Sequence, residues 1–287
     1  MKNPIYPCIW FDGQAKEAAT LYASAFPGTK ITTDTPMVVT IESANQKFMF
    51  LNGGPQFKPN PSISFYVVFE TKNEVDAAWK KLSVGGNVLM PLDQYDWSKH
   101  YGWLQDKFGV NWQLSFGKLT STGQKFSPTL MFTGAQHGNA EKAINFYASV
   151  FSPSSVVGIL RYAEKDGDVP GTIKHAQFTL DGYVMMVMDS SLMHQFGFTE
   201  GVSFVVDCET QEEIDYYWNK LTEGGEESMC GWLKDQFGVS WQIVPAILPD
   251  LMRDPVKGQR VVQAFLKMKK FDIEALKKAY EGDSVQK

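Results

Sequence analysis

The sequence has few cysteines, no long apolar run and no excess of basic residues, and each absence excludes a class of protein. Its three cysteines, Cys8, Cys208 and Cys230, are scattered, so they form neither a disulfide framework nor a CxxC metal knuckle. No run approaches the roughly 18 apolar residues that a membrane helix needs, and the first residues lack the apolar segment of a signal peptide. We therefore expect a cytoplasmic protein with no membrane partner.

The charge balance excludes a second class. The 27 basic and 32 acidic residues give a formal net charge of -5 and are interspersed, so no basic stripe is available for nucleic acid. At 287 residues, with 44% apolar content, the chain is long enough for about two domains with cores of their own. We expect a globular protein that does not bind nucleic acid.

One stretch occurs twice. Residues 102–114 read GWLQDKFGVNWQL and residues 231–243 read GWLKDQFGVSWQI, identical at nine of thirteen positions. In each copy a short apolar strand leads into a turn that contains Asp106 or Asp235, and an alternating strand follows. The pattern predicts a hairpin in which the aspartates form the turn and are not general acids.

The elements before each hairpin also repeat. The first half predicts a strand at 5–11, a helix with its apolar stripe from Ala15 to Phe26, strands at 37–41, 47–51 and 62–69, a helix with its stripe from Val75 to Leu82, and a loop at 91–100. The second half repeats this order, with Tyr147 lying 125 residues after Tyr22 and Trp218 lying 139 after Trp79. The copies differ in their loops. The second half lacks the loop that holds Tyr95, Trp97 and His100, and has a longer insert at 161–175.

These repeats predict a first domain at 1–120, a second at 121–249 and a helical extension at 250–287. In the extension Asp272 is a candidate N-cap and Gly282 follows the last predicted helix. We expect this extension to pack on the second domain.

The four βαβββ modules, the helix ends LYASAF and FYASVF and the GWLxDxFGVxWQ hairpin resemble the PhnB-like branch of the vicinal oxygen chelate superfamily, which has the glyoxalase/bleomycin-resistance fold. The same branch is named 3-demethylubiquinone 3-methyltransferase-like. The resemblance implies an α+β fold in which two modules make a curved mixed sheet around a cleft. It also implies that metalloenzymes of this fold hold a divalent ion there with four His or Glu side chains.

Those metal positions do not carry over to this chain. They fall near Pro7, Phe50, Ser64 and Gln113 in the first half and near Pro128, Val187, Ser203 and Gln242 in the second. Prolines, apolar residues, hydroxyls and neutral amides are weak ligands for a divalent metal, and the four histidines show no HxH or HExxH spacing. We expect no metal and no other cofactor.

The methyltransferase name also finds no support in the residues. A nucleoside cofactor such as S-adenosylmethionine is usually held by a glycine-rich turn between a strand and a helix. Gly53-Gly54 leads into a proline-rich linker and Gly85-Gly86 follows a helix, so neither pair has that context.

The candidate ligand-binding residues are those that the resemblance points into the cleft and a few neighbours. They are Ser64, Gln113, Ser203, Gln242, Trp103, Trp232, His175 and Asp189. The alternatives are structural: a glutamine can satisfy a backbone group, the tryptophans can form hairpin core and Asp189 can be a turn residue. His175 is a candidate acid or base, and Cys230 a weaker candidate nucleophile.

These observations predict a protein that binds a small apolar or aromatic organic molecule in its clefts without a metal. The alternatives are a metal-dependent glyoxalase-like or dioxygenase-like enzyme and a structural protein with a collapsed cleft. Whether the protein is an enzyme stays open. Because single-domain relatives commonly pair, the duplication predicts a monomer that contains the dimer within one chain.

Overall fold

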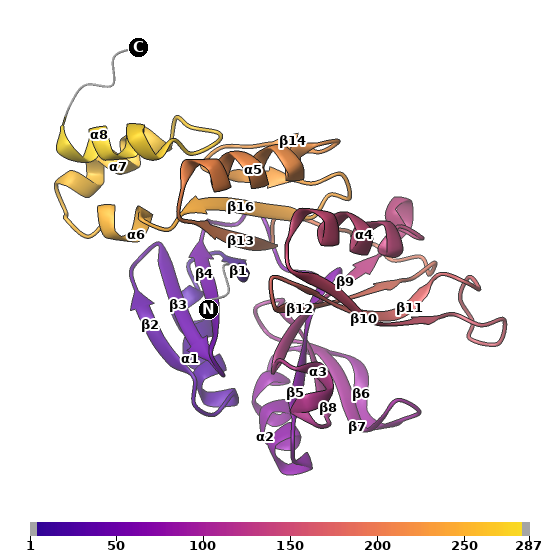
Figure 1. Cartoon of the computed structure of the whole chain (residues 1–287). Coiled ribbons are helices and arrows are strands. Elements are labelled where there is room, and N and C mark those ends of the chain that lie inside the picture. The colour runs from indigo at the N-terminus through magenta and orange to yellow at the C-terminus, as the bar shows by residue number, and fades with distance from the viewer. Residues whose placement is uncertain (1–4, 283–287) are drawn as a thin grey trace. The chain divides into compact units, whose positions relative to one another are not determined.

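The computed structural model describes residues 5–282, which form two compact units. One comprises residues 7–202 and the other residues 5–6 with 203–282. Figure 1 shows the helices and strands. The first module holds β1 (Ile5–Phe11), α1 (Ala15–Ala25), β2 (Lys30–Asp34), β3 (Val38–Ser43) and β4 (Gln46–Asn52). The second holds β5 (Ile63–Phe69), α2 (Lys72–Leu82), β6 (Asn87–Tyr95), β7 (Ser98–Gln105) and β8 (Asn111–Phe116), and α3 (Leu119–Thr122) follows.

The later modules have the same order. The third holds β9 (Phe126–Phe132), the short helix η1 (Gly134–Gln136), α4 (Ala140–Val150), β10 (Ser154–Arg161), β11 (Ile173–Leu180) and β12 (Tyr183–Asp189). The fourth holds β13 (Val202–Cys208), α5 (Gln211–Thr222), β14 (Glu226–Glu227), β15 (Trp232–Lys234) and β16 (Ser240–Pro245). The tail forms α6 (Leu248–Leu251), α7 (Lys257–Phe265) and α8 (Ile273–Glu281). The α+β class and the four βαβββ modules are confirmed.

Strand pairing joins the second module to the third. The eight-stranded sheet within residues 7–202 has the order β10-β11-β12-β9-β5-β8-β7-β6, in which β5 pairs with β9 antiparallel. In the first module β1 pairs with β4, β4 with β3 and β3 with β2. The expected mixed sheet of two modules is therefore confirmed, but within residues 7–202 it joins the second module to the third and not the first to the second. The domain boundaries at residues 120 and 249 stay a prediction.

The first two modules share an aromatic core instead of a sheet. Tyr22 of α1 and Phe26, the residue after α1, each place a ring centroid 5.0 Å from that of Trp112 in β8, and Phe65 of β5 lies 5.4 Å from the same ring. Phe26, Trp112 and Phe65 are buried. The apolar stripe of α1 thus packs against the helix-bearing face of the eight-stranded sheet.

Asp106 holds the repeated turn together. Its Oδ1 accepts hydrogen bonds from the backbone N–H groups of Phe108 (2.9 Å) and Val110 (3.1 Å). Its Oδ2 accepts from Trp112 Nε1 and Tyr22 Oη, both at 2.8 Å. Burial raises the pKa of Asp106, while these four hydrogen bonds act in the opposite direction.

Asp235 repeats this arrangement. It accepts from the N–H groups of Phe237 and Val239 and, at 2.8 Å, from Trp241 Nε1. The expected role of both aspartates as turn formers is confirmed.

Glycine is required inside the repeat. A Cβ built on Gly102 would lie 2.4 Å from the Trp79 ring, so the strand and α2 can approach only without a side chain there. Capping boxes begin the neighbouring helices: Thr71 with Glu74 at α2, and Thr210 with Glu213 at α5.

Two further expectations differ from the structure. Residues 91–100, expected as a loop, belong to β6 and β7, which form an irregular hairpin. Most residues of this segment therefore pair as strands, and only the two residues between Tyr95 and Ser98 form a turn. The insert expected at 161–175 is partly strand: Arg161 is the last residue of β10 and Ile173 the first of β11, so the loop itself is shorter than expected.

The bounds of α8, the last helix of the tail, agree with the sequence-based prediction. Asp272 caps α8 by accepting from the N–H of Ala275 at 2.9 Å, and Gly282 ends it with a φ of 92°. The N–H groups of Cys230 and Gly231 each donate to tail carbonyls, of Met268 and Lys269, at 2.7 Å. The tail therefore packs on the fourth module.

We predict that Asp106→Ala lowers the free energy of unfolding by at least about 3 kcal/mol, because it leaves three buried donors and one partly buried donor without an acceptor. Urea denaturation followed by tryptophan fluorescence measures the change. Glu42→Ala on β3, where the side chain is exposed, is the control and should change stability by less than about 0.5 kcal/mol. Equal effects of the two substitutions would contradict the role assigned to Asp106.

Candidate functional site

One face of the eight-stranded sheet carries polar side chains. The register pairs Gln113 with Tyr66 and Trp103, and Ser64 with Thr129. Because side chains alternate along a strand, these residues point away from the helix-bearing face, where Phe65 and Trp112 lie. We call this surface the Gln113 face.

Gln113 is held by two partners on this face. Its Nε2 donates to Ser64 Oγ at 2.8 Å, and Tyr101 Oη donates to its Oε1 at 2.7 Å. All three side chains are buried. Burial raises the pKa of Tyr101, so its phenol stays protonated and donates. The structure thus brings the predicted Ser64 and Gln113 together, but with their hydrogen bonds made to each other and to Tyr101.

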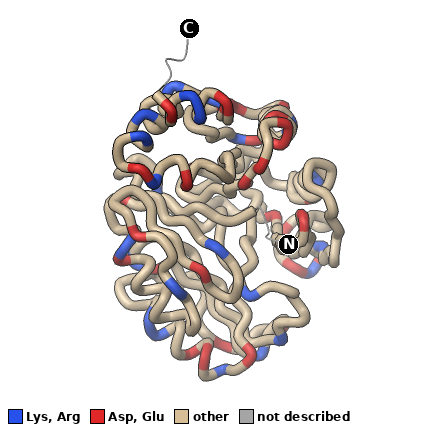
Figure 2. The backbone as a smooth tube through the Cα atoms, turned by 60° about the vertical axis from the view of Figure 1, so that its left-hand side comes forward, with Lys and Arg blue, Asp and Glu red and all other residues tan. Residues whose placement is uncertain are grey.

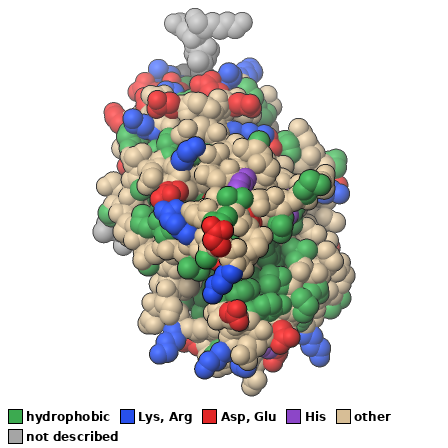
Figure 3. Space-filling view, turned by 90° about the vertical axis from the view of Figure 1, so that its right-hand side faces the viewer, with side chains coloured by type: hydrophobic (Ala, Val, Ile, Leu, Met, Phe, Trp, Pro, Cys, Tyr) green, Lys and Arg blue, Asp and Glu red, His purple; other side chains and the backbone are tan. Residues whose placement is uncertain are grey.

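An apolar cluster surrounds this network. Tyr101, Trp103 and Met131 are buried, and five partly buried side chains pack against them: Tyr66, Met90, Tyr95, Met188 and Phe196. Figure 3 views the molecule from the side on which β6, β7 and β11 lie in Figure 1, and shows hydrophobic side chains gathered in a hollow. The predicted Trp103 belongs to this cluster and pairs with Gln113.

Four polar atoms on the Gln113 face are buried without a hydrogen-bond partner in the described part of the chain. They are Trp103 Nε1, Asn111 Oδ1, Ser127 Oγ and Thr129 Oγ1. The register places Asn111 beside Ser64 and Ser127 beside Tyr66, so all four share the face. Buried polar groups in proteins nearly always have partners, and each exception needs a physical reason.

The fourth module repeats half of the network. Gln242 Nε2 donates to Ser203 Oγ at 2.9 Å, and both residues are buried. The predicted Trp232 pairs with Gln242 in the same sheet and is partly buried. Cys230 stands where the first copy has Tyr101, and its Sγ lies 3.7 Å from the Phe265 carbonyl oxygen. This site therefore lacks the phenol that fixes the amide of Gln113.

His175 lies on β11, on the same side of the sheet as the Gln113 network. Gln177 pairs with Met186, and Met186 pairs with Thr129, so Gln177 is on the Gln113 face, and His175 shares that face two residues away. Burial lowers the pKa of His175 below its ordinary value, so the imidazole is neutral at pH 7. It remains a candidate to contact a ligand.

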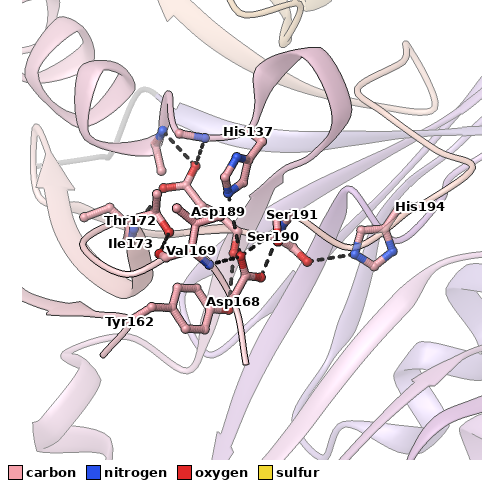
Figure 4. Close-up of polar contacts among 12 residues, drawn as sticks. His137, Tyr162, Asp168, Val169, Thr172, Ile173, Asp189, Ser190, Ser191 and His194 are labelled. Atoms are coloured by element: carbon pink, nitrogen blue, oxygen red, sulfur yellow. Dashed lines mark hydrogen bonds and ion pairs between the residues drawn. The ribbon is translucent and has the colours of Figure 1, made fainter. Parts of the chain in front are cut away.

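Asp189 has a structural position. Its carboxylate accepts from the N–H groups of Gly138 (2.8 Å) and Ala140 (3.3 Å) at the start of α4, and from the N–H of Ile173 (2.9 Å) at the start of β11. Figure 4 shows these contacts. Asp189 is buried and links a helix end to a strand, and its role at the cleft mouth stays a prediction.

The other histidines lie beside polar side chains. His194 Nε2 lies 2.9 Å from Ser190 Oγ, whereas His137 Nε2 is 3.7 Å from Asp168 Oδ1, too far for a hydrogen bond (Figure 4). His100 Nε2 lies 2.6 Å from Asp76 Oδ1 on α2. Among residues 5–282 no group of three or more His, Cys, Asp or Glu side chains could hold a metal.

Of the expected metal positions, Ser64 and Gln113 lie on one face, whereas Pro128 and Val187 are one residue out of register with it, and the expected grouping of strands also differs. Ser64 and Gln113 lie in the sheet with β9 and β12, not with Pro7 and Phe50. On β9 the residue beside Ser64 is Thr129, because Pro128 pairs with Phe65 on the other face. On β12 Met186 pairs with Thr129, so Val187 also points to the other face. Two hydroxyls, an amide and a thioether do not fit a divalent metal of this fold.

The rest of the surface offers weaker features. A hollow of about 540 Å³ is lined by Leu21, Ala77, Lys80, Lys81, Val84 and Lys107, away from the Gln113 face. Figure 2 shows basic and acidic residues interspersed along the chain. Within residues 5–282 no helix is long and apolar enough to cross a membrane.

Sequence analysis missed Tyr101, Asn111, Ser127 and Thr129. Asn111 lies two residues from Gln113 on the same strand, so strict alternation would have placed it on the same face. Ser127 and Thr129 lie on β9, which the sequence assigned to a separate domain. Tyr101 lies between the expected loop at 91–100 and the repeated stretch at 102–114, so no predicted strand included it.

Comparison with known proteins gives one family. The family model for 3-demethylubiquinone-9 3-methyltransferase matches residues 3–115 and 124–244. A PhnB protein from Bacillus cereus is 34% identical over 39% of this chain and 98% of its own, with a TM-score of 0.37. Glyoxalase I from Zea mays is 13% identical over 86% of this chain and 94% of its own, with a TM-score of 0.57, which shows a shared fold. No curated protein matches this chain.

The lowered pKa of His175 predicts a loss of stability in acid. The unfolded chain binds the proton more tightly, so the free energy of unfolding falls as the pH drops below about 6.5, by up to about 1.4 kcal/mol per pH unit. His175→Gln should reduce this fall in urea titrations from pH 7.5 to 5.5. His100→Gln is the control and should retain it. An unchanged pH dependence in His175→Gln would contradict the assignment.

Proposed function

The chain belongs to the 3-demethylubiquinone-9 3-methyltransferase family, and on that premise we propose that its Gln113 face binds one small, uncharged organic molecule without a metal. The bulk of this molecule is apolar or aromatic, and it carries a few hydrogen-bonding groups. The observation that carries the proposal is the set of four buried polar atoms without partners on one face of the sheet.

The apolar character of the ligand follows from the side chains around these atoms. Tyr66, Trp103, Met131 and Phe196 offer ring and thioether surface. Small-molecule sites in proteins combine such apolar walls with a few placed polar groups. A ligand ring would pack among these side chains and displace the partly buried ones.

The polar character follows from the unpartnered atoms. Trp103 Nε1 can only donate, Asn111 Oδ1 can only accept, and the Thr129 hydroxyl can do both. A ligand with one acceptor and one donor, such as a phenol or an amide, would satisfy two of them. Gln113 is less available, because both ends of its amide are engaged.

The ligand is uncharged because β5, β8, β9 and β12 bring no charged side chain to this face, and the charged residues nearest to it, Asp93 on β6 and Lys99 on β7, are exposed to solvent. The group on this face that titrates near neutral pH is His175, and burial keeps it neutral at pH 7. An ionised ligand would lose its hydration without gaining a counter-charge, which is unfavourable.

Metal-dependent glyoxalase-like or dioxygenase-like chemistry is less well supported, because Ser64, Gln113, Thr129 and Met186 do not form a divalent metal site. Methyl transfer has no support from the fold either: Gly53-Gly54 follows β4 and Gly85-Gly86 follows α2, so neither pair lies between a strand and a helix. We also propose a cytoplasmic location, on the ground that the three cysteines are free thiols.

Thr129→Val should separate folding from binding. Removing a buried hydroxyl without a partner should raise the unfolding free energy of the free protein by about 1 kcal/mol, because valine has nearly the same shape and no polar atom to satisfy. The same substitution should reduce the thermal stabilisation that uncharged phenols or aromatic amides give to the wild-type protein. Urea denaturation measures the change in unfolding free energy, and differential scanning fluorimetry measures the thermal stabilisation by ligand.

The matched control is Thr33→Val on β2, where the side chain is exposed. It should leave the ligand-induced shift unchanged. The proposal fails if no compound of these classes stabilises the wild-type protein, or if Thr129→Val keeps the full shift.

Metal independence is tested by elemental analysis. Untagged protein, purified without chelator and dialysed against trace zinc, nickel, iron and manganese, should retain far less than one metal atom per chain. Stoichiometric metal would overturn the proposal and favour the enzyme alternative.

A further inference from the structure

Four strands lie at the ends of the sheets: β2, β6, β10 and β14. A strand at the edge of a sheet has one row of backbone donors and acceptors with no neighbouring strand. Natural proteins guard such edges against pairing with another chain, by charge, proline, irregular backbone or short length. An edge strand without such protection is a candidate to pair with another chain.

Three of the four edges are guarded. Strand β2 carries Lys30 and Asp34, and Asp34 forms an ion pair with Lys16. Strand β6 contains Pro91 and a charged side chain, and its register shifts three times. Strand β14 has only two residues, both glutamates.

Strand β10 differs from the other three. Its first seven residues, SSVVGIL, include no charge and no proline. Their four large side chains are well exposed: Val156 47%, Val157 57%, Ile159 39% and Leu160 56%. An eight-residue strand with this composition is the kind of edge that pairs with another chain.

The apolar side chains lie on both faces of the sheet. Ile159 pairs with the buried Ala176, on the helix-bearing face, whereas Leu160 pairs with His175, on the Gln113 face. A partner that docked on one face would cover only half of them. A strand added to the edge would cover both faces and also satisfy the free backbone groups.

The duplication supplies an internal comparison. Strands β2 and β10 occupy equivalent positions, and the register shifts at the same place in both, around Thr32 and Val157. This shift is thus a property of the module. A second shift in β10, between Leu160 and Arg161, lies at the end of the strand. Thr32 Oγ1 lies 2.8 Å from Thr40 Oγ1, whereas the equivalent Val157 presents its side chain to solvent.

We propose that β10 pairs antiparallel with β10 of a second copy of this chain. Pairing about a two-fold axis between Val157 and Gly158 sets Val156 opposite Ile159 and brings no charged residues together. Arg161, at the end of the strand, is already engaged by Glu141 through two hydrogen bonds of 2.7 and 3.0 Å. Because a two-fold contact uses one edge of each chain, it gives a closed dimer and not a fibre.

This inference departs from the monomer that the duplication predicts. One pairing of eight-residue strands spans about 26 Å, so the contact belongs to the smaller class of interfaces and the dimer dissociates at low concentration. Sedimentation equilibrium between roughly 5 and 500 µM, a range chosen around micromolar affinity, should show the mass rise toward twice 32.3 kDa.

Two substitutions test where the contact lies. Val157→Lys places two lysines near the axis and should keep the protein monomeric across the concentration range. Thr32→Lys, at the equivalent position of β2, should leave dimerisation unchanged. Circular dichroism checks that both variants are folded.

Hydrogen exchange gives a readout that does not depend on the variants. Amides in peptides that cover 154–160 should gain protection at the high concentration, and those that cover 30–34 should not. A monomer at all concentrations overturns the proposal. So does a dimer that survives Val157→Lys or that leaves 154–160 unprotected.

Discussion

The buried carboxylate of Asp106 is the constraint on which the arrangement around the first hairpin depends. It fixes the turn through two backbone N–H groups, holds Trp112 by its indole nitrogen and holds α1 through Tyr22. Because Trp112 and Gln113 are neighbours on β8, fixing the indole on the helix-bearing face also fixes the amide on the opposite face. Asp235 repeats the turn and the indole contact. One acidic residue in each copy therefore sets the position of the hairpin and of the polar face behind it.

The exchange of modules between halves decides where a ligand could bind. The eight-stranded sheet joins β5–β8 of the first half to β9–β12 of the second, so the Gln113 face combines Ser64 and Gln113 with Ser127 and Thr129. The chain link between these modules is short, because only residues 117–125 separate β8 from β9. The aromatic core then binds the first module to the same sheet through Tyr22 and Phe26. The sheet therefore crosses the boundary between the two sequence repeats.

The equivalent glutamines of the two copies, Gln113 and Gln242, have different hydrogen-bond partners. In the first copy Tyr101 completes the hydrogen bonds of Gln113, and the unpartnered atoms lie on the neighbouring residues of the same face. In the second copy Cys230 replaces the phenol, while Gln242 keeps its bond to Ser203. The β6–β7 hairpin that supplies Tyr101 is much shorter in the fourth module, where its counterparts are the two-residue β14 and the three-residue β15. Loss of those residues therefore changes the chemistry of a site whose scaffold is retained.

The sequence by itself determined the modules, the helix stripes, the turn role of Asp106 and the cap at Asp272, because each depends on residues close together in the chain. It also brought Ser64 and Gln113 forward as a pair, through the family resemblance. Only the tertiary structure decided which modules pair, because strand pairing between distant segments leaves no local pattern. The one-residue slip at Pro128 and Val187 has the same origin: β9 and β12 are buried along almost their whole length, and only their pairing with neighbouring strands shows which of their residues share the face of Ser64.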